Sequence, residues 1–181
     1  MRVLIRADAS VKIGAGHVMR CLALAQGLRN YAAEVCFVCL ELPGHLADLI
    51  EQYGFACVRL PTPPIVPQSA TWQLDAQRDA EATLAAVGAG WDWCVVDHYA
   101  LDKTWETIMH QSCMRILCID DLANRRHDAD LLLDQNLHRE PEKRYNGLLP
   151  ANTDLMLGPA FALLRPEFVA ARAAAEPRHG H

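Results

Sequence analysis

A histidine follows the first short apolar run of the chain, at the end of the stretch "GAGH". Gly14 and Gly16 come just before His17, and the apolar residues after it repeat with the spacing of a helix. This pattern predicts that His17 lies in the first turn of a helix, where the positive end of the helix dipole favours the neutral ring. A neutral histidine beside a cleft can act as a general base. A histidine that only hydrogen-bonds to backbone groups at the helix start fits the position equally well.

Polar residues gather after four of the predicted strands. In an open α/β sheet, ligands bind beyond the carboxyl ends of the strands. Because parallel strands bring these ends to one edge, we expect the polar side chains to surround one crevice, and the glycines to let a ligand approach the backbone closely. The candidate substrate-binding residues are Asp8, Ser10, Gly14, Gly16, Asp97, Tyr99, Asp121 and Asn136.

Short apolar runs alternate along the chain with longer stretches of helical periodicity. Several of the runs are continuously apolar, as is typical of a parallel sheet that is covered on both faces. The sequence therefore predicts an α/β fold with a Rossmann-like, doubly wound parallel sheet. The predicted strands cover residues 2–6, 34–40, 55–60, 93–97, 115–120, 130–136 and 154–158, and the predicted helices cover residues 17–31, 44–54, 73–90 and 102–112. A proline-rich connection at 61–72 is either a functional loop or a plain surface excursion.

Cys36 and Cys39 form a CxxC pair, a spacing found in metal and redox sites. Residues three apart in a strand point to opposite faces, so placement in a strand predicts that the two thiols do not bind one ion. The seven cysteines of the chain are scattered through apolar segments. We interpret them as small buried hydrophobic residues in a reducing compartment.

Three further patterns in the sequence could mark binding sites. The glycine turn has Met19 where a dinucleotide fingerprint has its third glycine, and no Walker phosphate loop occurs in the sequence. The "DAD" at 128–130 has the spacing of a metal-binding DxD, but it precedes a strand and is expected at the edge opposite the crevice. Arg125, Arg126 and His127 are interpreted as a solvated loop rather than a phosphate site. We expect no cofactor and no metal.

The bulk composition is that of an ordinary globular protein, with 51% hydrophobic and 22% charged residues. The net charge of −5 argues against a sequence-independent contact with nucleic acid, which needs a basic face. No apolar stretch approaches the ~20 residues of a membrane span, and the first apolar run is too short for a signal peptide. We therefore expect a cytoplasmic protein with no membrane partner.

Four sequence blocks together closely resemble the amino-terminal half of the pseudaminic-acid pathway hydrolase family. They are "RADASVKIGAGHVMRCLALA", "VVDHYALD", "CIDDLANRRHDADLLLDQN" and "LMLGPAFALLRPEF", in this order between residues 6 and 168. The resemblance implies hydrolysis of UDP-2,4-diacetamido-2,4,6-trideoxy-β-L-altropyranose, by attack of water at the anomeric carbon with inversion, release of UDP and no metal ion. It also implies that His17 activates the water and that Tyr99 lies near the sugar.

The same resemblance implies a GT-B-like architecture of two domains. Residues 1–165 are expected to form the Rossmann-like sugar-binding domain with the catalytic histidine. Residues 166–181 are expected to start a linker helix toward a UDP-binding carboxy-terminal domain that is absent from this sequence. Two alternatives stay open: a non-catalytic domain that binds a sugar or a partner, and the acceptor half of a GT-B glycosyltransferase.

Overall fold

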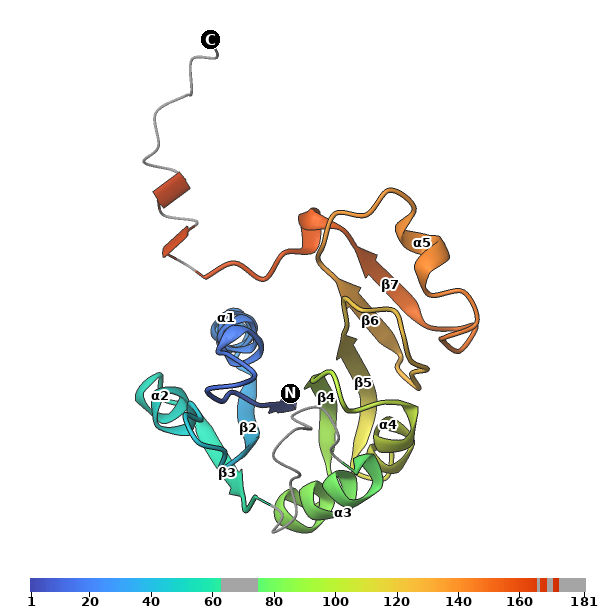
Figure 1. The fold of residues 1–181 in the computed structure, drawn as a ribbon. Coiled ribbons are helices and arrows are strands. Elements are labelled where there is room, and N and C mark those ends of the chain that lie inside the picture. The colour runs from blue at the N-terminus through green and yellow to red at the C-terminus, as the bar shows by residue number, and fades with distance from the viewer. Residues whose placement is uncertain (63–74, 166, 169–170, 173–181) are drawn as a thin grey trace.

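Seven parallel strands form one sheet at the centre of the fold (Figure 1). The strands are β1 (Arg2–Ala7), β2 (Glu34–Leu40), β3 (Ala56–Leu60), β4 (Trp91–Asp97), β5 (Cys113–Ile119), β6 (Leu131–Asp134) and β7 (Asp154–Leu157). The structure is a computed structural model that describes residues 1–62, 75–165, 167–168 and 171–172. The sheet order is β3-β2-β1-β4-β5-β6-β7, with all neighbours parallel. This order confirms the predicted doubly wound, Rossmann-like α/β fold.

The strand order reverses between β1 and β4. From β1 the chain runs outward through β2 to β3, and it then returns to pair β4 with the other side of β1. In sheets of this type the two connections leave the edge in opposite directions, which opens a crevice beyond the carboxyl ends of the two central strands. The turn after β1 and the end of β4 therefore lie where such a crevice is expected.

Two helices cover each face of the sheet. On one face, α1 (Gly16–Arg29) and α2 (Ala47–Gln52) pack against a core that includes Val18 and Ile50. On the other face, α3 (Ala76–Val87) and α4 (Lys103–Met109) pack against a core that includes Ala80 and Trp105. Of the strands between them, β1, β2 and β4 are mostly buried on both sides, as their continuous hydrophobic runs predicted. Each helix thus fixes one connection relative to the sheet edge.

Cys36 and Cys39 contribute to different cores, on opposite faces of β2. The predicted separation of the two thiols is therefore confirmed, and its reason is the two-residue period of a strand.

The predicted strands all exist, with bounds that differ by at most two residues. Two short elements were not predicted, α5 (Pro141–Arg144) and the 3-10 helix η1 (Pro159–Phe161). Most of the proline-rich connection at 61–72 and most of the expected linker at 166–181 lie outside the described residues. The two-domain architecture therefore stays a prediction. Every helix in the described part of the chain is too short or too polar to cross a bilayer.

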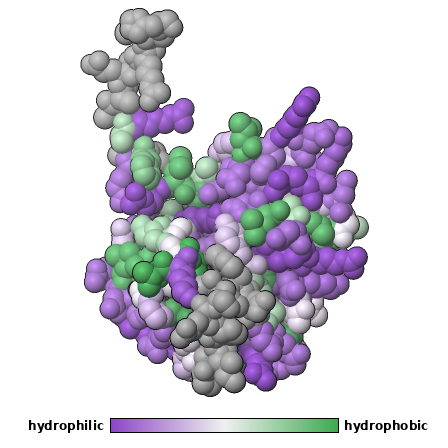
Figure 2. Space-filling view, in the orientation of Figure 1, coloured by the Kyte–Doolittle hydropathy of each residue, from purple (hydrophilic) through white to green (hydrophobic). Residues whose placement is uncertain are grey.

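The surface seen in Figure 2 is hydrophilic over much of the region of α5 and β7, with smaller hydrophobic spots among the polar side chains.

Candidate active site

The turn between β1 and α1 is held by Ser10. The Ser10 hydroxyl oxygen accepts hydrogen bonds from the backbone N–H groups of Lys12 and Ile13, at 3.2 and 3.0 Å. The backbone oxygen of Ser10 also accepts from the N–H of Gly14 at 2.8 Å. Gly14 has a φ of +82°, a left-handed conformation that favours glycine. These bonds close the turn and lead the chain directly into α1.

Gly16, the first residue of α1, faces open space: a Cβ built on it would meet no atom within 4 Å. The residue before it, Ala15, has no side chain that could cap the helix, and none does so. Within the described residues, the first backbone N–H groups of α1 are therefore left without a side-chain cap.

His17 and Asp97 meet across the crevice at the switch point. Nδ1 of His17 lies 2.6 Å from Oδ1 of Asp97, although the two residues are 80 positions apart in the chain. Asp97 is the last residue of β4 and pairs in register with Ala7 of β1, so the sheet places it beside the turn that leads to α1. His17 is 5% exposed and Asp97 is fully buried. The pair is therefore preorganised in a site largely shielded from water.

Arg20, one turn after His17 on α1, binds both oxygens of the same carboxylate. Its Nε lies 2.5 Å from Oδ2 of Asp97 and its Nη2 lies 2.6 Å from Oδ1. Burial by itself raises the pKa of Asp97, but the hydrogen bonds from Arg20 and His17 outweigh this effect and hold the pKa below its ordinary value. Asp97 is therefore ionised, and it accepts the Nδ1–H of His17. A neutral imidazole in this tautomer carries a free lone pair on Nε2.

Tyr99 and Asp121 extend this cluster toward the end of β5. The rings of His17 and Tyr99 are in edge contact, with centroids 4.6 Å apart and planes at 81°. The Tyr99 hydroxyl and Nη1 of Arg20 each lie 3.4 Å from Oδ2 of Asp121. Burial and the nearby Asp121 carboxylate raise the pKa of Tyr99. Tyr99 is therefore a proton donor at neutral pH, not a base.

Asp8 lies below the turn in a separate buried network. Both of its oxygens accept from the guanidinium of Arg6, at 2.6 and 2.9 Å, and Oδ1 also accepts from the N–H of Leu40 at 2.8 Å. Nε2 of His98 lies 3.4 Å from Oδ2. Asp8 has no exposed surface. Its carboxylate therefore connects β1 to the end of β2. Asp8 would affect the binding of a substrate only by fixing the shape of the turn.

Arg6 is shared between Asp8 and Asp79 of α3. Its Nε and Nη2 donate to the two oxygens of Asp79 at 3.0 and 2.7 Å, and Nε1 of Trp105 donates to Asp79 as well. Nearby Asp79 and Asp8 outweigh burial and raise the pKa of Arg6. A permanent cation thus holds two buried carboxylates between the turn and α3.

Asn136 lies apart from the cluster around His17. It is exposed, and its backbone N–H donates to Oδ1 of Asp134 at 3.0 Å. Within the described residues, no hydrogen bond joins Asn136 to His17 or Asp97. Of the nine predicted residues, the structure therefore brings four side chains together, those of His17, Asp97, Tyr99 and Asp121. Ser10, Gly14 and Gly16 form the turn that leads to His17, while Asp8 and Asn136 occupy other surroundings.

The interpretation of residues 125–127 as a solvated loop was wrong for two of the three. Arg125 donates to Oδ1 of Asp120 at 2.7 Å and to the backbone oxygen of His98 at 3.1 Å. His127 is buried against Glu106 of α4, whereas Arg126 is exposed. The buried carboxylates of Asp120 and Glu106 need cationic or N–H partners. They bind Arg125 and His127, and these contacts hold the loop against the fold.

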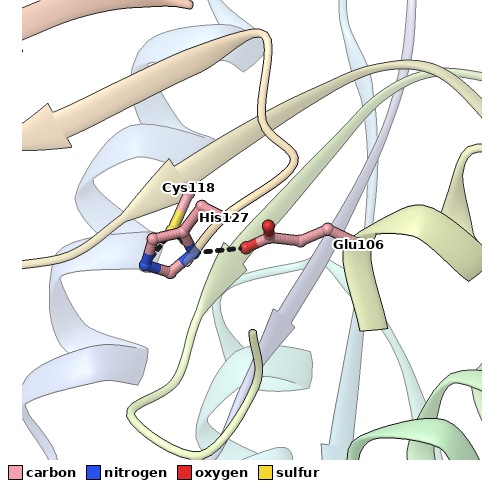
Figure 3. Close-up of side chains that lie close together, drawn as sticks. All are labelled: Glu106, Cys118 and His127. Atoms are coloured by element: carbon pink, nitrogen blue, oxygen red, sulfur yellow. Dashed lines mark hydrogen bonds and ion pairs between the residues drawn. The ribbon is translucent and has the colours of Figure 1, made fainter. Parts of the chain in front are cut away.

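One group of buried side chains has the composition of a metal site: Glu106, Cys118 and His127 (Figure 3). Nδ1 of His127 lies 2.7 Å from Oε1 of Glu106, and the Cys118 sulfur lies beside the ring, 3.3 Å from Nδ1. Ligand atoms around a tetrahedral zinc ion stand about 3.3 Å apart or more, since zinc–nitrogen bonds are about 2.0 Å long. Burial and the neighbouring Glu106 carboxylate also raise the pKa of the Cys118 thiol, which favours its protonated form. The 2.7 Å contact between His127 and Glu106 is therefore a direct hydrogen bond, closer than two ligands of one zinc ion stand to each other.

Arg20 was not predicted as a site residue. Its signal in the sequence is its spacing: three residues after His17, it lies on the same face of a helix. The spacing alone does not reveal the partner, because Asp97 is 77 residues away along the chain.

Comparison with known proteins supports the resemblance on which the sequence analysis relied. No protein-family model matches the chain. The chain is 30% identical over 169 residues to the UDP-2,4-diacetamido-2,4,6-trideoxy-beta-L-altropyranose hydrolase of Campylobacter jejuni subsp. jejuni serotype O:2 (strain ATCC 700819 / NCTC 11168). The match covers 93% of this chain and 53% of the relative, so the chain spans about half the length of the curated protein. The predicted resemblance is thus confirmed: nearly the whole of this chain is similar to about half of a hydrolase named for UDP-2,4-diacetamido-2,4,6-trideoxy-beta-L-altropyranose.

Proposed function

We propose that this chain is the catalytic-base half of a UDP-sugar hydrolase, acting on a UDP-linked diacetamido-trideoxyhexose. The contact that carries the proposal is the 2.6 Å hydrogen bond between Nδ1 of His17 and Oδ1 of Asp97. It joins the one histidine of the "GAGH" turn to an ionised carboxylate at the switch point, where open α/β sheets bind their ligands. The similarity to a curated hydrolase of such a sugar nucleotide supports the same reaction.

In the proposed reaction His17 removes a proton from water. Nε2 accepts the proton while the water oxygen forms a bond to the anomeric carbon of the sugar. On the opposite face the bond from this carbon to the phosphate oxygen breaks, and its electron pair leaves with UDP. The products are UDP and the free sugar with inverted anomeric configuration. Asp97 stabilises the imidazolium that forms, because its ionised carboxylate already accepts the Nδ1–H.

Tyr99 and the open start of α1 are the proposed contacts to the sugar. Tyr99 keeps its proton and touches the edge of the His17 ring, so its hydroxyl can donate to a sugar oxygen near the reacting carbon. The start of α1 offers backbone N–H groups that the N-cap side chain leaves uncapped, and a Cβ built on Gly16 would meet no atom within 4 Å. Ser10 shapes this turn, and Asp121 holds both Tyr99 and Arg20.

The proposal is tested by following release of UDP and free sugar by proton NMR. The substrate is the UDP-linked diacetamido-trideoxyaltrose. The protein is used in two forms, the 181-residue chain and this chain joined to the part of the Campylobacter relative that it does not match. We expect the joined form to release UDP, and the first sugar anomer formed to be the inverted one. Replacement of His17 by Ala should lower the rate by about 10³-fold or more, the scale of a lost general base.

The controls separate this function from its alternatives. If His17→Ala retained most of the rate, His17 would not be the base. If a joined protein that unfolds cooperatively and binds the sugar nucleotide released no UDP, the non-catalytic alternative would replace the hydrolase. If the sugar appeared as a glycoside of an added alcohol in preference to the free sugar, the chain would be half of a glycosyltransferase.

A further inference from the structure

A basic pocket lies in the segment that follows β6. It has a volume of about 400 Å³ and is lined by His138, Arg139, Glu140, Lys143 and Arg144. These residues come from the connection between β6 and α5 and from α5 itself.

The charge of the pocket is opposite to that of the chain. Its lining contains three permanent cations and one carboxylate, and the carboxylate of Asp134 lies directly behind it, so the balance is +1 in a chain whose net charge is −5. Lys143 is paired with the carboxylate of Glu140. Arg139 is exposed, and its guanidinium makes no hydrogen bond among the described residues. Arg139 is therefore available for an anion that enters the pocket.

The inner wall of the pocket is fixed by the buried carboxylate of Asp134. Its Oδ2 lies 3.2 Å from Nε2 of His138 and 3.6 Å from Nε of Arg144, and it accepts from the Tyr145 hydroxyl at 3.0 Å. Neither nitrogen has hydrogen-bond geometry toward Asp134, although both atoms are buried. Nε2 of His138 and Nε of Arg144 are thus unsatisfied within the described chain, and buried polar atoms of this kind are expected where a ligand supplies the missing partner.

Asp121 connects the pocket to the residues around His17. Nη2 of Arg144 donates to the backbone oxygen of Asp121 at 2.7 Å. The side chain of the same residue contacts Arg20 and the Tyr99 hydroxyl. Asp121 therefore links Arg144 of the pocket lining to the cluster around His17.

We propose that this pocket binds phosphoryl groups, and that it holds the diphosphate of a sugar nucleotide while the sugar lies against His17. Guanidinium groups match phosphate oxygens in charge and geometry, which favours phosphate over a neutral ligand. The assignment to a leaving diphosphate rests on the proposed function, whereas binding of the phosphoryl group itself does not. The domain with the base would then also contact the departing group, in addition to any contact from a second domain.

The test is a titration of the 181-residue chain with inorganic pyrophosphate, followed by amide chemical shifts in NMR. We expect the largest shifts between residues 136 and 145. The double variant R139A/K143A should bind pyrophosphate about tenfold more weakly or worse, the scale of one lost charge-assisted contact. The control R78A removes one exposed cation from α3 and should leave the affinity unchanged. Unchanged affinity in the double variant, or shifts confined to other segments, would overturn the proposal.

The source of the phosphoryl group is decided by competition. If UDP displaces pyrophosphate and binds more tightly, the pocket takes a nucleotide diphosphate. If orthophosphate competes as well as UDP does, the pocket is a site for free phosphate, and the assignment to the leaving group is overturned. These outcomes are independent of the proposed hydrolysis, because they measure binding and leave His17 intact. Hydrolysis that depends on His17 without pyrophosphate binding would reject the pocket alone.

Discussion

His17 and Arg20 lie one turn apart on α1 and bind the same carboxylate, that of Asp97. The guanidinium occupies both carboxylate oxygens and fixes the plane of the group, and the fixed carboxylate in turn orients the imidazole. The next residue after Asp97 in the chain, His98, faces the other network and lies 3.4 Å from Asp8. Because successive strand residues point to opposite faces, the end of β4 serves both networks at once.

Replacement of Asp97 by Asn should remove most of the activity. An amide cannot stabilise the imidazolium, and it can present its NH₂ group to Nδ1, which would move the ring proton to Nε2. We expect kcat to fall by about 10²- to 10⁴-fold, with a smaller change in KM. UDP release in the joined protein measures the effect. Asp154→Asn, an exposed change at the start of β7, is the control. A D97N variant with the kcat of the parent would contradict the role of Asp97.

Replacement of Arg20 by Ala should move the acidic limb of the rate profile to higher pH. In the folded chain Arg20 helps to hold the pKa of Asp97 below its ordinary value, so Asp97 stays ionised as the pH falls. Without the guanidinium, burial dominates and the pKa of Asp97 rises. Activity would then be lost at a pH at which the parent still works.

A pH–rate profile of R20A beside R20K checks this prediction. R20K keeps one positive charge and should show a smaller displacement of the limb. R78A should show none, since Arg78 lies on α3 and pairs only with Asp75 in the described chain. An R20A profile that differs from the parent in height alone would show that Arg20 does not control the ionisation of Asp97.

Replacement of Arg6 by Met should destabilise the fold strongly. The change leaves Asp8 and Asp79 buried without their shared cation. Loss of one partner from a buried ion network costs about 3–5 kcal/mol. Urea unfolding followed by circular dichroism measures the loss. The triple variant R6M/D8N/D79N should recover much of it, because no uncompensated charge remains. Equal stability of R6M and the parent would show that the two carboxylates find other partners.

Chelation should leave both stability and turnover unchanged. Glu106 and His127 are in direct contact at 2.7 Å, closer than two ligands of one zinc ion stand to each other. The melting temperature of the chain and the rate of UDP release are to be measured before and after dialysis against EDTA. A lower melting temperature that zinc restores would contradict the interpretation of Figure 3. A rate that depends on added divalent ion would contradict hydrolysis without a metal.

Much of the secondary structure could be predicted because its causes are local. The continuous apolar runs of β1, β2 and β4 mark strands buried on both faces, whatever their neighbours are. The same local pattern placed His17 in the first turn of α1 and separated Cys36 from Cys39. α5 was not predicted, since a helix of four residues has too few positions to show a period.

The site itself depends on which strands are neighbours, and the local pattern carries no information about that. His17 meets Asp97 because β1 pairs with β4. Arg125 is partly buried because it donates a hydrogen bond to Asp120 at the end of β5. Asp8 looked like a ligand from its place after β1, yet the pairing of β1 with β2 buried it against Arg6 and Leu40. The sequence by itself thus determined the strands, the helices and the residue types at the sheet edge. Only the tertiary structure decided which of these side chains face one another, because those contacts join segments that lie far apart in the chain.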